Sequence, residues 1–230
     1  MKRFVCALFL AVFFALPAAA QQMATRTWVD SHGTKWTEVT TTQVVTEQPR
    51  SERIAAALAG LPRFGPFTVV DSAHAAMAGE SDSQSPGLFK AMMQAFPGIR
   101  VLEMVDCAGT ADDGANLELG RLIRAHGLDI DVPSGGSVRS GGVELFLAGA
   151  TRHAADDAEF GVHAWMDEHG RQPGDYAADA PANRTYLDYY GEMGLTPENA
   201  KGLYALTNSV PNEQVLWLKT ADLKRFVVVD

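Results

Sequence analysis

The pattern of hydrophobic positions changes its period repeatedly along residues 64–230. Short apolar runs predict strands, and segments in which apolar residues recur at helical spacing separate these runs. Because strands alternate with helices, we expect an α/β fold built from βαβ units with right-handed crossovers and a largely parallel sheet. The predicted strands are 67–71, 75–79, 100–105, 128–132, 160–165 and 214–218, and the predicted helices are 85–96, 116–126, 142–150, 184–193 and 197–207.

A different pattern precedes this region. Residues 24–47 are rich in Thr, Val and Trp and are interrupted by the turn-like segment 30–33, which predicts a β-hairpin. Ser51 is then expected to cap a short helix over 52–61, which a proline ends. The sequence therefore predicts an N-terminal extension, 21–63, followed by a larger domain, 64–230.

Residues 1–20 have the features of a secretory signal peptide. Two basic residues precede the apolar run Phe4–Leu16, and three alanines end at Ala20. The run is shorter than the roughly 20 apolar residues that span a membrane. We expect cleavage after Ala20 and a periplasmic or secreted protein. No second long apolar run follows, so no stable membrane span is expected after cleavage.

Composition narrows the class of protein further. The chain has 230 residues, of which 47% are hydrophobic, and this content is globular rather than disordered. Its net charge of −9, with no long Lys/Arg cluster, argues against a nucleic-acid partner. Signal cleavage removes Cys6 and leaves Cys107 without a disulfide partner. No metal-binding motif such as HExxH occurs, so neither a metal nor a cofactor is expected.

Three segments at the ends of predicted strands are candidates for a functional site. In open α/β sheets, sites form at the carboxyl ends of the strands. The loops 106–114 and 133–142 are glycine-rich and precede helices, where backbone N–H groups can hold a phosphate or a developing oxyanion. Neither loop contains GxxxxGK[ST] or GxGxxG, so the oxyanion interpretation fits better. The third segment is the strand 160–165.

Individual residues in these segments have structural as well as catalytic interpretations. Ser140 stands at the start of a predicted helix, where it can be an N-cap or a nucleophile. His163 can be a core histidine or a base. Asp112 and Asp113 are expected to cap a helix or to form an acidic rim, and Cys107 to be a buried cysteine.

Taken together, three segments resemble the ClpP/crotonase superfamily, and specifically the Clp-protease proteolytic subunit. Segment 136–150 is similar to the nucleophile segment of that family, with a Gly four residues before Ser140 and an apolar helix that ends in Ala-Gly-Ala. Segment 161–165 resembles the strand of the family's catalytic histidine, and 107–110 its first oxyanion loop. The resemblance covers about 64–230 and implies repeated ββα units and a ring-forming homo-oligomer.

The resemblance also implies roles for individual residues. Ser140 would be the nucleophile and His163 the general base. The backbone N–H groups of Gly141 and of Gly109 or Thr110 would form the oxyanion hole. Such donors are worth roughly 2.7–4 kcal/mol each.

The residue that orients the histidine does not match the family pattern. The position of the family's aspartate falls near Val215, which cannot accept a hydrogen bond from His163 through its side chain. We favour Glu213 for this role, with Asn212 and Asp188 as alternatives. A pair of Ser and His oriented by a main-chain carbonyl is a further alternative.

Three functions are compatible with these features. The leading hypothesis is an exported serine hydrolase, in particular a peptidase, that acts on a peptide or ester. The second is a Clp-like binding or oligomerisation module with weak or no activity, which the unmatched acidic residue favours. The third is a crotonase-type acyl-transfer enzyme, but this class needs CoA, and the signal peptide argues against it.

Overall fold

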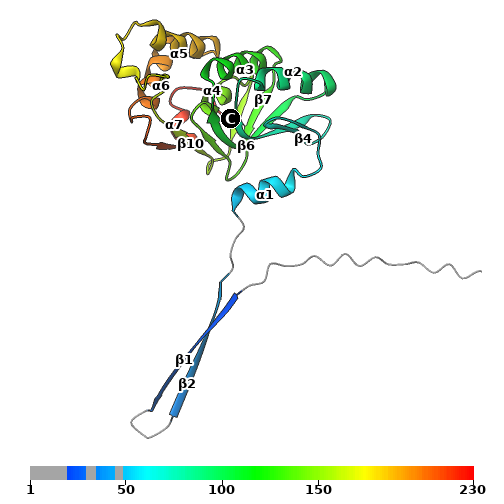
Figure 1. Ribbon diagram of the computed structural model, residues 1–230, viewed down its shortest axis with the longest axis vertical. Helices are drawn as coiled ribbons and strands as arrows, with labels where there is room; N and C mark the ends of the chain where they lie inside the picture. The colour runs from blue at the N-terminus through cyan, green and yellow to red at the C-terminus, as the bar shows by residue number, and fades with distance from the viewer. Residues whose placement is uncertain (1–19, 30–34, 45–48) are drawn as a thin grey trace, which may run out of the picture. The chain divides into compact units, whose positions relative to one another are not determined.

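The computed structural model of the protein describes residues 20–29, 35–44 and 49–230 (Figure 1). The expected signal peptide lies outside the described residues except for Ala20. The chain divides into two compact units between Arg50 and Ser51, and each is described by itself. The expected short helix of the N-terminal extension falls in the second unit.

The first unit contains the predicted hairpin. Strands β1 (Ala20–Val29) and β2 (Lys35–Val44) pair antiparallel, with a register that runs from Ala20 opposite Val44 to Val29 opposite Lys35. The turn expected at 30–33 lies outside the described residues.

The second unit, 51–230, is a mixed α/β domain with a nine-stranded sheet. Its helices and strands follow one another in the alternating order that the hydrophobic pattern predicts. The elements are α1 (Arg50–Ala57), β3 (Arg63–Phe64), β4 (Phe67–Val69), β5 (His74–Ser81), α2 (Ser85–Ala95), β6 (Val101–Thr110), α3 (Asp113–Ala125), β7 (Asp129–Val132), β8 (Ser137–Arg139), α4 (Gly142–Leu147), β9 (Arg152–Ala154), β10 (Glu159–Val162), the 3₁₀ turn η1 (Pro173–Asp175), α5 (Pro181–Glu192), α6 (Pro197–Thr207), β11 (Leu216–Lys219) and α7 (Thr220–Leu223).

Parallel pairing predominates in this sheet. The strand order is β11-β10-β8-β6-β5-β4-β3, and β7 pairs with both β6 and β9. The pairs β5–β6, β6–β7, β6–β8, β8–β10 and β7–β9 are parallel, and only the pairs toward the two ends of the order are antiparallel. The expected α/β class with a largely parallel sheet is confirmed. Two strands and a helix recur in sequence as β4-β5-α2, β7-β8-α4 and β9-β10-α5.

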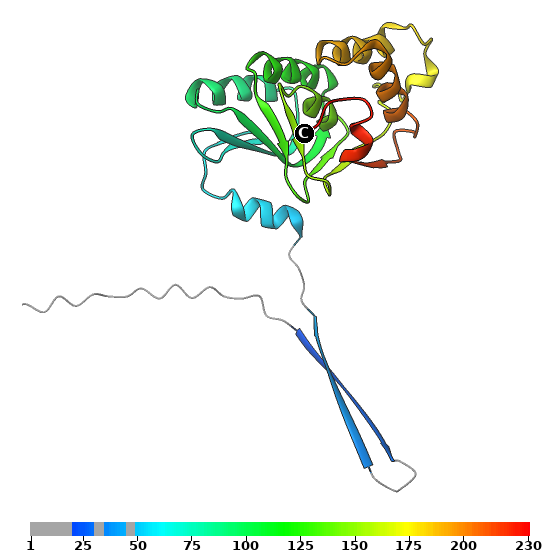
Figure 2. The same cartoon turned by 180° about the vertical axis from the view of Figure 1, so that it is seen from behind.

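Helices α2, α3 and α4 lie together on one side of the sheet (Figures 1 and 2). Their apolar faces form the core with the buried side of the strands. Leu102, Met104 and Cys107 of β6 are fully buried, as are Leu119 and Ile123 of α3. Burial contributes about 1.5–3 kcal/mol for each large apolar side chain, so this interface fixes β6 relative to the helices.

The arrangement of the central strands positions the candidate site. β6, β8 and β10 are neighbours and run parallel, so their carboxyl ends meet at one edge of the sheet. These ends are Thr110, Arg139 and Val162. The three segments identified from the sequence therefore leave the sheet side by side, at the edge where sites form in open α/β sheets.

Several local predictions differ from the structure. Ser51 lies inside α1 and does not cap it. The predicted loop 133–142 contains the short strand β8, which the pattern does not predict because three residues in a glycine-rich segment show no period. Helix α4 is shorter than the predicted 142–150, since it ends at Leu147.

Candidate active site

Ser140 occupies the turn between β8 and α4. It is the one non-glycine residue with a positive φ in the described part of the chain, at +48°. Its N–H donates to Gly161 O at 2.7 Å, and its carbonyl accepts from Val143 N at 2.9 Å. A strained backbone of this kind costs about 1–3 kcal/mol and persists where its surroundings hold it, often at active sites.

The start of α4 excludes one interpretation of this serine. The N-cap residue of α4 is Gly141, and no side chain makes a cap hydrogen bond there. The hydroxyl of Ser140 is therefore not a helix cap, and the structural alternative considered for this residue is wrong.

The glycine of the first loop lies directly against Ser140. A Cβ atom built on Gly109 would lie 3.0 Å from Ser140 Cβ and 3.6 Å from Ser140 Oγ. Gly109 also has a φ of +119°, which favours glycine. On the other side, a Cβ on Gly141 would lie 2.6 Å from Thr110 Cγ2. The structure thus brings segments 109–110 and 140–141 face to face, as the sequence predicted.

A buried amide connects these two segments. Asn116 on α3 is 2% exposed, and its Nδ2 donates to Gly141 O at 2.7 Å. The Ser81 hydroxyl at the end of β5 donates to Asn116 Oδ1 at 2.8 Å and also lies 3.3 Å from Gly109 O. Asn116 therefore holds the turn after Ser140 against the loop at Gly109. This residue was not predicted from the sequence, although an amide on the apolar face of a predicted helix indicates a buried hydrogen bond.

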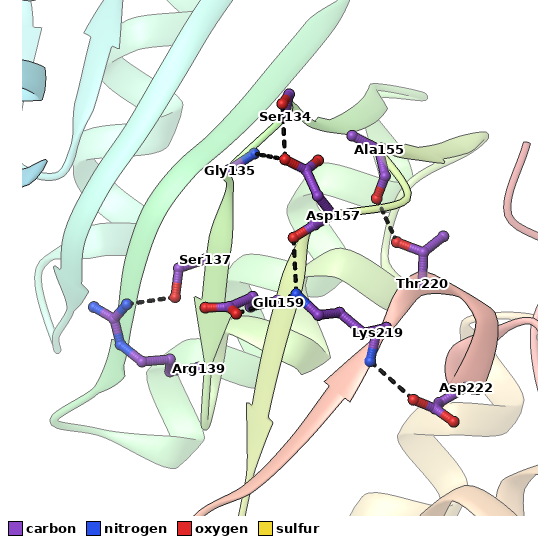
Figure 3. A network of polar contacts seen from close by, with 10 residues as sticks. All are labelled: Ser134, Gly135, Ser137, Arg139, Ala155, Asp157, Glu159, Lys219, Thr220 and Asp222. Atoms are coloured by element: carbon purple, nitrogen blue, oxygen red, sulfur yellow. Dashed lines mark hydrogen bonds and ion pairs between the residues drawn. The ribbon is translucent and has the colours of Figure 1, made fainter.

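A polar network surrounds β8, the strand that precedes Ser140 in the chain (Figure 3). Asp157 accepts from Ser134 Oγ at 2.8 Å and from Gly135 N at 3.0 Å, which fixes the turn before β8. Arg139 Nη1 donates to Ser137 Oγ at 2.7 Å and to Asp106 Oδ1 at 2.8 Å. The turn before β8 and the last residue of β8 are thus both held in place, next to Ser140.

His163 follows the last residue of β10 and lines the same cavity as Ser140. Its Nδ1 lies 2.9 Å from Ala164 O and 3.1 Å from Asn212 Nδ2. Asn212 Nδ2 also donates to Ala164 O, at 2.9 Å. We assign the proton of the neutral imidazole to Nδ1, so that Ala164 O accepts from both groups. This tautomer leaves Nε2 free to accept a proton.

The three residues considered for orienting His163 differ in whether they contact it and line the cavity. Asn212 contacts His163 and lines the cavity, and its backbone N–H is held by Gln172 Oε1 at 2.9 Å. Glu213 and Asp188 are exposed, and neither lines the cavity. Of the residues named from the sequence, the structure places Asn212 beside the histidine, together with the main-chain carbonyl of Ala164.

The cavity has a volume of about 440 Å³ and a wall rich in aromatic side chains. Trp165 stacks on Tyr186 with ring centroids 6.0 Å apart, and its Nε1 donates to the Tyr204 hydroxyl at 2.7 Å. Five of the residues to which the sequence assigned a possible catalytic or oxyanion role line the cavity, so the structure brings them together. These are Thr110, Ser140, Gly141, His163 and Asn212.

Glu144 is a buried acid in the wall of this cavity. Its side chain is on α4, and the residue is 8% exposed. Tyr190 donates its hydroxyl hydrogen to Glu144 Oε1 at 2.8 Å. Burial, the largest cause, raises the pKa of Glu144 to about 7, although the Tyr190 hydrogen bond lowers it. From the sequence, Glu144 was only part of a predicted apolar helix and had no predicted role.

The remaining polar residues of the first loop have structural roles. Asp112 is the N-cap of α3 and accepts from Ala115 N at 2.9 Å, so its predicted capping role is confirmed. Asp113 lines the cavity and accepts from the Tyr186 hydroxyl at 2.9 Å. Cys107 is buried as predicted, and burial raises its thiol pKa well above the usual range, which keeps the thiol protonated and unreactive.

Two general features concern the described residues alone. Within 20–29, 35–44 and 49–230, no group of three or more His, Cys, Asp or Glu side chains could hold a metal ion. In the same ranges, no helix has the length and apolar character needed to cross a membrane.

The protein has a mixed α/β fold whose parallel strands carry a strained serine and a histidine to one cavity. Among solved structures, a variant of the 1510-N membrane-bound stomatin-specific protease in complex with a substrate peptide is similar at a TM-score of 0.42 and 12% identity, covering 70% of this chain and 77% of its own. A variant of ClpP1 from Listeria monocytogenes has a TM-score of 0.48 and 14% identity, with coverages of 67% and 87%. No protein-family model and no curated protein matches the chain. The function therefore has to be argued from the site itself.

Proposed function

We propose that the protein is a serine hydrolase that cleaves peptides or esters, with Ser140 as nucleophile and His163 as general base. The observation that carries the proposal is the position of Ser140. It has a strained backbone, Gly109 lies directly against it, and it shares a cavity with His163. Strain at a serine that does not cap its helix is typical of a nucleophile held in an exposed turn.

The proposed reaction begins when Ser140 Oγ attacks the carbonyl carbon of the substrate. His163 Nε2 takes the hydroxyl proton, and the C=O electrons move to the oxygen to form a tetrahedral oxyanion. Backbone N–H groups of Gly141 and of Gly109 or Thr110 would stabilise this oxyanion. His163 then returns the proton to the leaving amine or alcohol. Water releases the acyl group by the same steps.

The orientation of His163 is the part of the proposal that departs most from a Ser-His-Asp triad. A carboxylate both orients the imidazole and stabilises the imidazolium that forms. Ala164 O accepts from the ring and Asn212 holds this carbonyl in place, but neither group carries a full charge. We therefore expect slower turnover than in such triads. The neutral partner also favours, as the second candidate, a Clp-like binding module with weak activity.

Export and assembly belong to the same proposal. Residues 1–20 would be removed, so the mature protein would begin at Gln21 in the periplasm or outside the cell. N-terminal sequencing of the exported protein tests this, because an intact Met1 would contradict cleavage. A homo-oligomer is proposed from the Clp-like pattern alone, and sedimentation of the mature protein tests it.

Hydrolysis of an activated ester tests the catalytic pair. Ser140→Ala and His163→Ala should each remove nearly all activity, and the double variant should be little worse than either, because the two groups act as one unit. Ser209→Ala removes an exposed hydroxyl outside the cavity and should keep full activity. Full activity in Ser140→Ala would favour the binding-module or crotonase-type alternatives.

A further inference from the structure

The cavity that holds Ser140 is acidic. Glu144 lies four residues after Ser140, about one helical turn away, and both line the cavity. Glu80 and Asp113 line it as well. No Lys or Arg stands among the residues that line this cavity in the described part of the chain. Any substrate whose carbonyl reaches Ser140 therefore places its neighbouring side chain in a negatively charged environment.

Glu144 is the most buried of these acids. Among the described residues, Tyr190 is the one side chain that hydrogen-bonds to Glu144, and it donates to Oε1. None of the ion pairs found among the described residues includes Glu144. A buried carboxylate without a cationic partner is unfavourable, because burial removes its hydration. A cation that enters the cavity would supply the missing charge and would form a charge-assisted hydrogen bond.

The rest of the cavity suits a long basic side chain. Trp165 and Tyr186 both line the wall, and ring surface on the cavity side can contact an aliphatic stem or a guanidinium group. The Asp113 carboxylate lies beside Tyr186 and accepts a hydrogen bond from its hydroxyl at 2.9 Å. The volume of about 440 Å³ falls in the range of small-molecule sites.

We propose that this cavity is a specificity subsite for a Lys or Arg side chain of the substrate, with Glu144 as its charge partner and Asp113 as a second acid. This inference rests on the proposed hydrolase function, because that function brings the substrate carbonyl to Ser140. Glu144 acts by binding the side chain and takes no part in the bond-breaking steps.

A binding measurement tests the subsite without turnover. The Ser140→Ala protein is titrated calorimetrically with the methyl esters of Nα-acetyl-arginine and Nα-acetyl-citrulline, which are nearly isosteric and differ in charge. We expect the arginine compound to bind roughly 10- to 100-fold more tightly, the range for hydrogen bonds to charged groups. Adding Glu144→Gln should bring the two affinities together. Glu118→Gln, which removes an exposed acid outside the cavity, should keep the preference.

Two results would overturn the proposal. One is equal or weaker binding of the arginine compound by the protein with Glu144 intact. The other is a preference that Glu144→Gln leaves unchanged. If Glu144→Gln does not fold, as judged by circular dichroism, the first comparison still decides. Asp113→Asn, at an exposed residue, should then reduce the preference severalfold.

Hydrolysis separates the failure of this proposal from that of the proposed function. The wild-type chain is given the arginine ester, the citrulline ester and an activated apolar ester. If hydrolysis depends on Ser140 but shows no preference for the arginine ester, the proposed subsite is wrong and the proposed hydrolase function stands. If the arginine compound binds tightly in a Glu144-dependent way but no ester is hydrolysed, the proposed hydrolase function is wrong and the binding site stands.

Discussion

Glu144→Gln should change how the stability of the protein depends on pH. Glutamine keeps the size of the side chain and an oxygen that can accept from the Tyr190 hydroxyl, so the substitution removes the titration and little else. Burial raises the pKa of Glu144 from 4.5 to about 7 in the folded protein. Between these values the folded state keeps a proton that the unfolded state has released.

The sign of the effect follows from proton linkage. Where the folded state binds more protons than the unfolded state, the free energy of unfolding falls as the pH rises. Glu144 therefore lowers the stability of the wild type progressively from about pH 4.5, and the loss is complete above about pH 7. The difference between these two pKa values corresponds to a total loss of about 3 kcal/mol in the free energy of unfolding. About 2–3 kcal/mol of this is lost between pH 5 and pH 8.

Urea unfolding followed by tryptophan fluorescence measures this effect. Both proteins are unfolded at pH 5, 6, 7 and 8, and the difference in the free energy of unfolding cancels the other titrating groups. Glu144→Gln should gain stability relative to the wild type as the pH rises, whereas the exposed control Glu118→Gln should show a nearly flat difference. A flat difference for Glu144→Gln, or one that falls with pH, would refute the argument that Glu144 is buried without a cationic partner.

Three further substitutions, the first with a matched control, test the geometry of the site. Gly109→Ala should cost about 1–3 kcal/mol of stability and most of the activity, because it adds backbone strain and a methyl group against the proposed nucleophile. As a control, Gly79 has a similar φ of +104° but open space around it. Gly79→Ala should therefore lower the stability and leave the activity unchanged. Asn116→Ala should lower kcat more than it raises KM, since it frees Gly141 O; a change in KM alone would contradict this role. Asn212→Asp should raise kcat about tenfold by placing a carboxylate beside the proposed base, and unchanged kinetics would show that this residue does not orient it.

The sequence predicted the parts of the site that depend on local chemistry. The glycine-rich loops 106–114 and 133–142 could be found because glycines that follow strands and precede helices mark such turns. The roles of Gly109, Ser140 and Gly141 within these loops were implied by the resemblance to Clp proteases. The meeting of these turns could also be expected, since the carboxyl ends of neighbouring parallel strands share one edge. The helices 85–96 and 197–207 agree closely with α2 and α6 for a similar reason, because their apolar positions repeat over several turns.

Other parts depend on contacts between distant segments and could not be predicted in this way. Asn212 reaches His163 across 49 positions of the chain, and a one-residue choice between it and Glu213 depends on how the loop before β11 turns. The burial of Glu144 depends on α5, which brings Tyr190 over α4. Asn116 has a role only because β5 and the turn after β8 meet beside α3.

Labelling by a fluorophosphonate tests the central claim most directly, because this reagent reacts with a serine hydroxyl that a neighbouring base activates. The mature protein is treated with the reagent, and the modified residue is mapped by mass spectrometry of its peptides. The account predicts one label, on Ser140, with no labelling in Ser140→Ala and strongly reduced labelling in His163→Ala. A folded protein that takes up no label, or takes it up at a residue other than Ser140, would contradict the assignment of Ser140 as nucleophile.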